Sequence, residues 1–212
     1  VHVMRDLQTL LDQSSARHSH LCPRQVLGIR VALAGIEALN LTVPRSDKRL
    51  LTILETDGCF ADGVEVASGC TVGHRTLRIE DYGKIAAVFV DVRQDCAVRV
   101  APRMDVRERA YAYAPDERRH YFAQLYGYQV MPDEVLLTVE EVQLTRPIAE
   151  IVSRPGVRVN CASCGEEIIN EREVLVDDCP YCRHCAHGGY YQVAMPASLV
   201  IAQPMGLNGT GR

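Results

Sequence analysis

The spacing of the C-terminal cysteines constrains the fold of this chain more than any other feature. Cys161 and Cys164 form one C-x-x-C pair, and Cys179, Cys182 and Cys185 follow close behind. A C-x-x-C turn delivers two sulfur ligands to one side of a zinc ion, which takes four ligands at tetrahedral positions. A segment this short has too small a hydrophobic core to fold without a disulfide bond or a bound metal ion. We therefore predict a zinc-binding module over residues 157–191.

The second pair is ambiguous, because Cys179 with Cys182 and Cys182 with Cys185 have the same spacing. His184 and His187 are additional candidate ligands. The alternative, that the thiols are redox-active or merely buried, explains two such neighbouring pairs less well. We prefer the four-cysteine zinc site that omits Cys179 and consists of Cys161, Cys164, Cys182 and Cys185.

The charge of this module disfavours nucleic acid as a partner. Between residues 157 and 190, three arginines stand against six acidic residues, and the whole chain has a net charge of -4. Four thiolates around a divalent ion leave the site itself negative, so phosphates would be repelled. We expect a structural or protein-contact role for the module.

The use of cysteine also predicts the compartment. The chain has nine cysteines, an odd number, and no apolar N-terminal segment follows a basic start. Both features argue against a disulfide-stapled secreted protein and for reduced thiols in the cytoplasm. No run of 18 apolar residues is present, so we expect no membrane span.

Hydrophobic periodicity predicts helices and strands in the remainder of the chain. Helical spacing runs from Val3 to Leu11 and again over residues 23–39, where Pro23 suits the first turn. Residues 50–55 read as a buried strand, 59–67 as a short helix and 75–100 as an antiparallel meander. Pro115 should divide a helical region over residues 105–126, and residues 136–144 supply another strand.

These elements define an α+β fold in which N-terminal helices pack on an antiparallel sheet, with a small C-terminal treble-clef-like zinc finger. We expect a core domain over residues 1–145 and a linker over residues 146–156, which contains Pro147 and Pro155. The finger then spans residues 157–191, and residues 192–212 form a C-terminal tail whose last residues, 206–212, we expect to be frayed.

A second group of metal-ligating residues lies in the core domain. The residue before Pro23 is biased toward extended geometry, so His18, His20 and Cys22 should project to one side. Cys22 also falls at the N-cap of the next helix, where the helix dipole favours a thiolate. Cys59, after a glycine turn, is positioned to face a pocket, and Cys70 completes the candidate set. The alternative is that these side chains are buried for packing, as we expect for Cys96.

The order of these blocks resembles the E-subunit family of formylmethanofuran dehydrogenase. The resemblance rests on three segments over roughly residues 15–105: residues 18–30, residues 57–59 and residues 69–74. The two C-x-x-C pairs followed by Tyr190 and Tyr191 are similar to a zinc finger that some members append, which favours Cys182 with Cys185. One departure is His74, because the family usually has lysine there.

This resemblance implies an α+β core, a tightly intertwined homodimer and a metal-binding pocket lined by His and Cys, but not formylmethanofuran chemistry. We therefore expect a cytoplasmic, homodimeric, zinc-binding accessory or sensor protein, with another protein or a small-molecule ligand as its further partner. One alternative is an enzyme with Cys22 or Cys59 as nucleophile, or with a zinc-activated water and His18 or His20 as base. Another is a transcriptional regulator or protein-interaction module.

Overall fold

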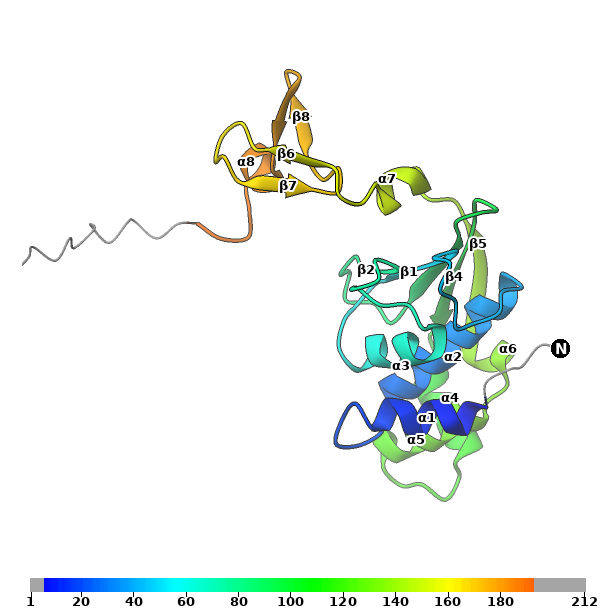
Figure 1. Ribbon diagram of the computed structural model, residues 1–212. Coiled ribbons are helices and arrows are strands. Elements are labelled where there is room, and N and C mark those ends of the chain that lie inside the picture. Colours follow the sequence, from blue (N-terminus) through cyan, green and yellow to red (C-terminus); the bar gives the residue numbers. More distant parts are fainter. Residues whose placement is uncertain (1–5, 193–212) are drawn as a thin grey trace, which may run out of the picture. The chain divides into compact units, whose positions relative to one another are not determined.

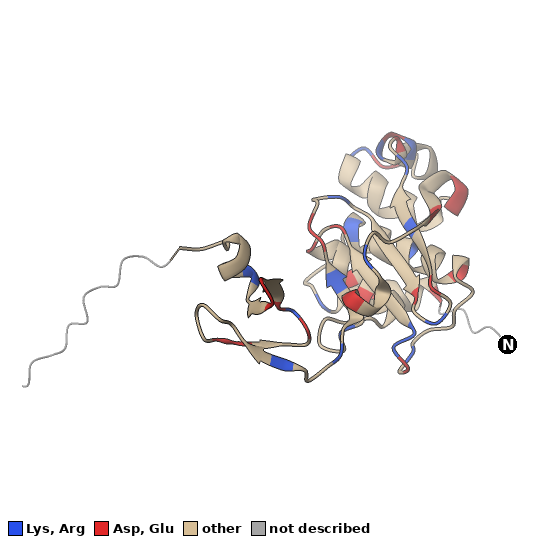
Figure 2. Cartoon of the chain, turned by 90° about the horizontal axis from the view of Figure 1, so that it is seen from above, with Lys and Arg blue, Asp and Glu red and all other residues tan. Residues whose placement is uncertain are grey.

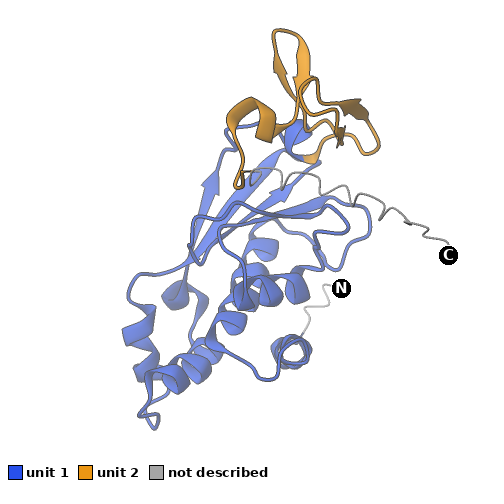
Figure 3. Ribbon diagram, turned by 90° about the vertical axis from the view of Figure 1, so that its left-hand side faces the viewer, with its two compact units in different colours: residues 1–151 blue, residues 152–212 orange. Residues whose placement is uncertain are grey.

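The computed structural model describes residues 6–192. The chain divides into two compact units, residues 1–151 and residues 152–212 (Figure 3). The predicted helical position Val3 and residues 193–212 of the expected tail lie outside the described residues.

A five-stranded sheet forms the centre of the first unit (Figure 1). Its strands, in chain order, are β1 (Leu50–Leu54), β2 (Leu77–Ile79), β3 (Ala87–Asp91), β4 (Cys96–Pro102) and β5 (Leu137–Val142). The spatial order is β2-β1-β3-β4-β5, and β1, β3, β4 and β5 pair antiparallel. The α+β class and the largely antiparallel sheet predicted from the sequence are thereby confirmed.

The meander over residues 75–100 was predicted wrongly at its first strand. β2 pairs with β1 in parallel, with Thr52 opposite Leu77, and does not pair with β3. The cause is α3 (Cys59–Ser68), which lies between β1 and β2 in the chain. A helix in that position carries the chain back across the sheet and makes the next strand parallel.

Helices gather on one side of this sheet (Figure 1). Besides α3 they are α1 (Leu7–Ser15), α2 (Pro23–Ala38), α4 (Val106–Tyr113), α5 (His120–Val130) and α6 (Asp133–Leu136). α2 contacts β3, β4 and β5 and is the central helix of the layer. Pro115 lies between α4 and α5, as predicted. The interface between helices and sheet is apolar and includes the fully buried Phe60, Phe89 and Val100.

Glycines allow α2 and α3 to cross in close contact. A Cβ atom added to Gly28 would lie 2.3 Å from the Phe60 carbonyl oxygen, and one added to Gly63 would lie 2.3 Å from the Gln25 carbonyl oxygen. Real Cβ atoms do not approach backbone oxygen so closely, so neither position accepts a side chain in this arrangement. The close crossing fixes the first turns of both helices relative to each other.

Arg30 connects α2 to the end of α5. Its guanidinium donates hydrogen bonds of 2.6 Å to the carbonyl oxygens of Tyr128 and Met131 and contacts the Asp133 carboxylate at 2.6 Å. Carbonyl groups in the last turn of a helix lack partners within the helix, and a cation there is favourable. Arg30 therefore has a structural role.

The second unit contains two hairpins and a helix. Its elements are β6 (Arg158–Asn160), β7 (Glu167–Ile169), β8 (Val174–Val176), β9 (Cys179–Tyr181) and α8 (Arg183–His187). β6 pairs with β7 and β8 with β9, both antiparallel. This order matches the predicted treble-clef-like finger. The expected linker, residues 146–156, also contains a short helix, α7 (Ile148–Val152), that the sequence pattern did not predict.

Candidate metal centre and core pocket

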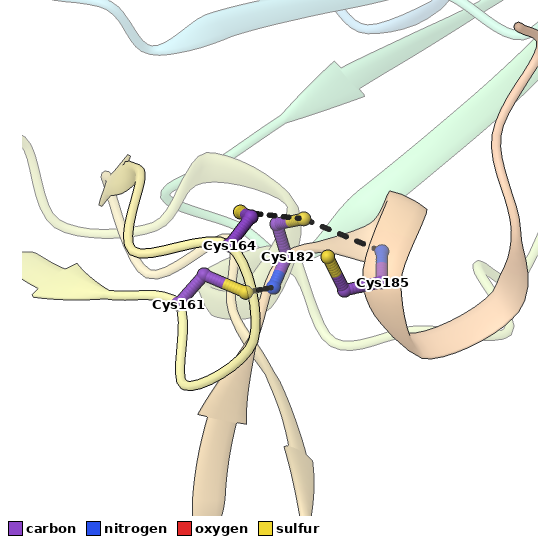
Figure 4. Close-up of side chains that lie close together, drawn as sticks. All are labelled: Cys161, Cys164, Cys182 and Cys185. Atoms are coloured by element: carbon purple, nitrogen blue, oxygen red, sulfur yellow. Dashed lines mark hydrogen bonds between the residues drawn. The ribbon is translucent and has the colours of Figure 1, made fainter. Parts of the chain in front are cut away.

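Four cysteine sulfurs converge in the second unit. The Sγ atoms of Cys161, Cys164, Cys182 and Cys185 all lie within 4.8 Å of one another (Figure 4). The Sγ atoms of Cys164 and Cys182 are 4.0 Å apart. Tetrahedral zinc with Zn–S bonds of about 2.3 Å requires sulfurs about 3.8 Å apart. The set therefore fits zinc in both donor type and spacing.

Local structure explains why these sulfurs converge. The turn between β6 and β7 carries Cys161 and Cys164, and Gly165 allows the backbone to bend there with a φ of +77°. Cys182 is the N-cap of α8, and Cys185 lies within that helix. Residues three apart across a helix start face the same side, so Cys182 and Cys185 present their sulfurs together, while the turn between the two strands brings Cys161 and Cys164 together.

Backbone N–H groups point at the same sulfurs. Cys182 N–H donates to Cys161 Sγ at 3.3 Å, and Cys185 N–H donates to Cys182 Sγ at 3.3 Å. Backbone donors from Cys164 and Cys182 lower the pKa of Cys161 to about 6. For Cys164, the Glu166 N–H lowers the pKa, but burial and the three neighbouring thiols prevail and raise it to about 12. Four thiols so close together ionise jointly only beside a cation.

The other candidate ligands of the finger lie elsewhere. Cys179 is exposed at the first residue of β9, where it pairs with Val176. The His184 ring stacks on Tyr191 with centroids 4.5 Å apart. Neither these two residues nor His187 belongs to the four-sulfur cluster.

Acidic residues are distributed over the finger's hairpins (Figure 2). Arg154 pairs with Glu171 at 2.5 Å, and Arg158 pairs with Glu167 at 3.0 Å. These two arginines are therefore already engaged with carboxylates.

Three of the five predicted core ligands do not come together. The Nε2 atom of His18 contacts the Asp62 carboxylate of α3. His20 is exposed, with its Nδ1 atom 3.1 Å from the Ser19 hydroxyl. Cys70 is buried in the hydrophobic core, where its Sγ lies 3.6 Å from the Leu50 carbonyl oxygen and burial raises its pKa.

The other two predicted ligands, Cys22 and Cys59, line one pocket of about 550 Å³. Cys22 is the N-cap of α2, and Cys59 is the first residue of α3. Burial, and to a smaller degree the neighbouring Cys59, raises the pKa of Cys22. Within residues 6–192, the finger cysteines are the one set of three or more metal-ligating side chains that lie this close together.

Sequence reasoning missed two residues that contact the predicted ligands or line their pocket, Asp62 and Tyr121. Asp62 lies outside the pocket lining, one helical turn after Cys59 on α3, and its carboxylate contacts His18. The i, i+3 spacing shows that Asp62 and Cys59 share a helix face, but it does not show the contact with His18. Tyr121 lines the pocket, and burial together with the thiols of Cys22 and Cys59 raises its pKa. No sequence pattern connects α5 with the start of α2, so Tyr121 was not predictable. His74 is exposed beside the Thr71 hydroxyl at 3.0 Å and does not line this pocket.

Comparison with known proteins identifies the family. Residues 17–141, more than half of the chain, match the family described as FmdE, Molybdenum formylmethanofuran dehydrogenase operon. The chain belongs to the FmdE family. The matched range contains the Cys22 and Cys59 pocket and ends before the finger.

Two individual proteins are similar to this FmdE-family chain. A probable S-adenosyl-L-methionine-binding protein of Archaeoglobus fulgidus is 35% identical over 97 residues, which cover 44% of this chain and 26% of that protein. This chain thus spans about a quarter of the length of that relative. The crystal structure of a tungsten formylmethanofuran dehydrogenase E-subunit (FmdE)-like protein from Syntrophus aciditrophicus matches with a TM-score of 0.57 and 19% identity. The alignment covers 91% of this chain and 98% of the other, and it shows a shared fold.

Among the described residues, none of the helices is both long and apolar enough to cross a bilayer.

Proposed function

We propose that this FmdE-family protein is a cytoplasmic, homodimeric, zinc-binding accessory or sensor protein. In this proposal the finger holds a structural zinc ion, and the core pocket at Cys22 and Cys59 takes a metal ion or a small ligand. The observation that supports it most is the convergence of four cysteine sulfurs within 4.8 Å.

A structural role for the finger zinc follows from the coordination that the four cysteines offer. Four protein ligands occupy all the coordination positions of a tetrahedral zinc ion and leave none for substrate or water, as in closed structural zinc sites. The finger also has little core of its own, since Cys161 and Ile168 are its buried apolar residues among those described after α7. The metal would therefore supply much of the free energy of folding of this unit.

The homodimer is supported by an apolar stripe on α5, consisting of Phe122, Tyr126 and Val130. These residues are spaced by four and share one helix face. The rings of Phe122 and Tyr126 stack, while 47% of Tyr126 and 63% of Val130 are exposed. An exposed apolar stripe of this kind is typical of a contact surface, and we propose that it contacts a second copy of the chain.

An enzymatic role remains the rival hypothesis, and the pocket bears on it directly. A nucleophilic cysteine requires a thiolate, but burial raises the pKa of Cys22. Cys22 and Cys59 form a pair of thiols that would ionise when a ligand binds. This behaviour fits a sensor better than it fits an enzyme, whose nucleophilic cysteine is ionised before the substrate arrives. The name of the Archaeoglobus relative raises S-adenosylmethionine binding as a second candidate, but among the described residues no carboxylate lines the pocket to balance a sulfonium cation.

Zinc removal tests the proposed division between the two units. We expect a chelator to remove one zinc ion per chain and to unfold residues 158–187, while the helices and sheet of the first unit stay folded. Hydrogen exchange measured by mass spectrometry, with and without chelator, reports both units in one sample. Unchanged protection of the finger after complete zinc loss would contradict the structural role.

The core site is tested with a Cys22→Ser and Cys59→Ser double variant. We expect it to keep its secondary structure and the finger zinc, and to lose any second bound metal or co-purifying ligand. His20→Ala is the matched control, because His20 is exposed and lies outside the pocket lining.

A further inference from the structure

The pocket at Cys22 and Cys59 carries a concentration of positive charge that the proposed metal or ligand role does not explain. Three of its lining residues are arginines: Arg24, Arg103 and Arg107. The described residues that line it include no aspartate or glutamate. An unbalanced group of cations around a concave surface attracts anions.

Carboxylates do not pair directly with these arginines in the described part of the chain, although Asp105 interacts electrostatically with Arg103. Within residues 6–192, none of the three forms an ion pair, and Arg103 donates through its Nε to the Glu134 carbonyl oxygen at 2.9 Å. Asp105, which lies between Arg103 and Arg107 in the chain, is paired with Arg109 at 2.5 Å. The guanidinium groups of Arg24 and Arg107 are therefore available to a ligand.

Three helices begin at the same pocket. Cys59 is the first residue of α3, and Pro23 with Arg24 and Val106 with Arg107 open α2 and α4. The N-terminal end of a helix carries a partial positive charge and unpaired N–H groups, and it is a common site for phosphate and carboxylate groups. Three such ends add to the field of the arginines.

The remaining wall is largely apolar. Leu27, Ile85 and Val106 line it together with the Tyr121 ring. A volume of about 550 Å³ lies within the range of pockets that bind small organic molecules. An inorganic ion alone would leave this apolar surface exposed to water, so a ligand with an apolar part fits the wall better.

We propose that this pocket binds a small organic anion whose phosphate or carboxylate group contacts Arg24 and Arg107 and whose apolar part contacts Leu27, Ile85 and Val106. The two thiols lie in the same pocket and would detect the ligand or a metal bound with it. This inference rests on the proposed ligand role of the core pocket and names the chemical class of its ligand.

Calorimetric titration of the full chain with phenyl phosphate tests this inference. Benzoate serves as the carboxylate probe, and benzyl alcohol and benzylamine are the neutral and cationic controls of similar shape. We expect at least one of the two anions to bind and to slow the alkylation of Cys59 by iodoacetamide, and the controls to do neither. Binding of phenyl phosphate alone or of benzoate alone supports the proposal and identifies the anionic group.

An Arg24→Gln and Arg107→Gln double variant locates the binding. Both side chains are exposed and unpaired within the described residues, so the variant should fold normally, whereas Arg103 is left intact because of its backbone contact. We expect the affinity for the anion to fall at least about tenfold, the loss of one charge-assisted hydrogen bond or more. Arg118→Gln, at an exposed position outside the pocket lining, should bind as the original chain does.

Three results would overturn the proposal: no binding of either anion, equal binding of the neutral or cationic control, or undiminished binding by the double variant. Zinc content measured on the same samples separates this inference from the proposed function. A chain that holds the finger zinc but binds neither anion would contradict the anion pocket and leave the zinc proposal standing. A chain that binds the anion but contains no zinc would contradict the zinc proposal and leave the anion pocket standing.

Discussion

Gly28 of α2 and Gly63 of α3 meet where the two helices cross, so that a Cβ atom on Gly28 would lie 3.1 Å from the Gly63 Cα. This crossing holds the first turns of α2 and α3 together and places Cys22 and Cys59 in one pocket. Gly28 belongs to one of the sequence blocks that resemble the FmdE family, and the contact gives a physical reason for a glycine there.

Gly28→Ala should therefore destabilise the first unit. The added methyl group would collide with the Phe60 carbonyl group at 2.3 Å, and separating two packed helices costs about 1–3 kcal/mol in the free energy of unfolding. Urea denaturation followed by circular dichroism measures this change. Gly73→Ala is the control, because a Cβ atom there meets nothing within 4 Å. Equal stability of the two variants would show that the crossing tolerates a side chain.

The Arg49 and Asp91 pair predicts a pH dependence of stability. Arg49 donates hydrogen bonds of 2.8 Å and 2.5 Å to the Asp91 carboxylate, whose side chain is fully buried. These bonds, with backbone donors from Arg93 and Gln94, hold the pKa of Asp91 below its usual range. A lowered carboxyl pKa stabilises the fold above the unfolded-state pKa and loses this effect as the pH falls through the folded-state value.

We accordingly expect Asp91→Asn to lower the free energy of unfolding by roughly 1.5–3 kcal/mol at pH 7, typical of hydrogen bonds to charged groups. The difference in the free energy of unfolding between Asp91→Asn and the original chain should shrink as the pH falls below about 4, the usual carboxyl pKa. Urea denaturation between pH 3 and 7 measures it, with Asp116→Asn, at an exposed position, as control. A difference that is independent of pH would rule out a role for the carboxylate charge.

The α5 stripe predicts a variant that weakens assembly. Val130→Glu would place a charge on the proposed contact surface, and we expect the proposed dimer to dissociate at concentrations where we expect the original chain to be dimeric. Because an intertwined dimer lacks a stable folded monomer, secondary structure should be lost together with the dimer. Sedimentation velocity and circular dichroism measure both, and Tyr82→Glu is the control because Tyr82 is exposed outside the stripe. A folded monomer persisting on dilution would contradict the intertwined arrangement.

Much of this fold was predictable because its signals are local. The C-x-x-C spacing, the first turn at Pro23 and the break at Pro115 act within a few residues, and the structure has the corresponding elements. The parallel pairing of β2 with β1 was missed because a strand's partner depends on the α3 crossover and not on its own alternation of residues.

The core pocket was predictable in part, for the same physical reason. The prediction that Cys22 lies at the start of a helix, made from its position before Pro23, is confirmed. His18, however, contacts Asp62, because the packing of α3 brings that carboxylate close to it. Arg107 and Tyr121 come from α4 and α5, which are distant in the sequence, so the tertiary fold alone brings them to this pocket.

The zinc content of purified cysteine variants tests the central claim most directly. Cys182 lies in the four-sulfur cluster, whereas Cys179, three residues earlier, is exposed and outside it. We predict about one zinc ion per chain in the original protein and in Cys179→Ser, and none in the finger of Cys182→Ser, because zinc in a structural site needs all four ligands. Zinc retained by Cys182→Ser, or lost from Cys179→Ser, would contradict the account.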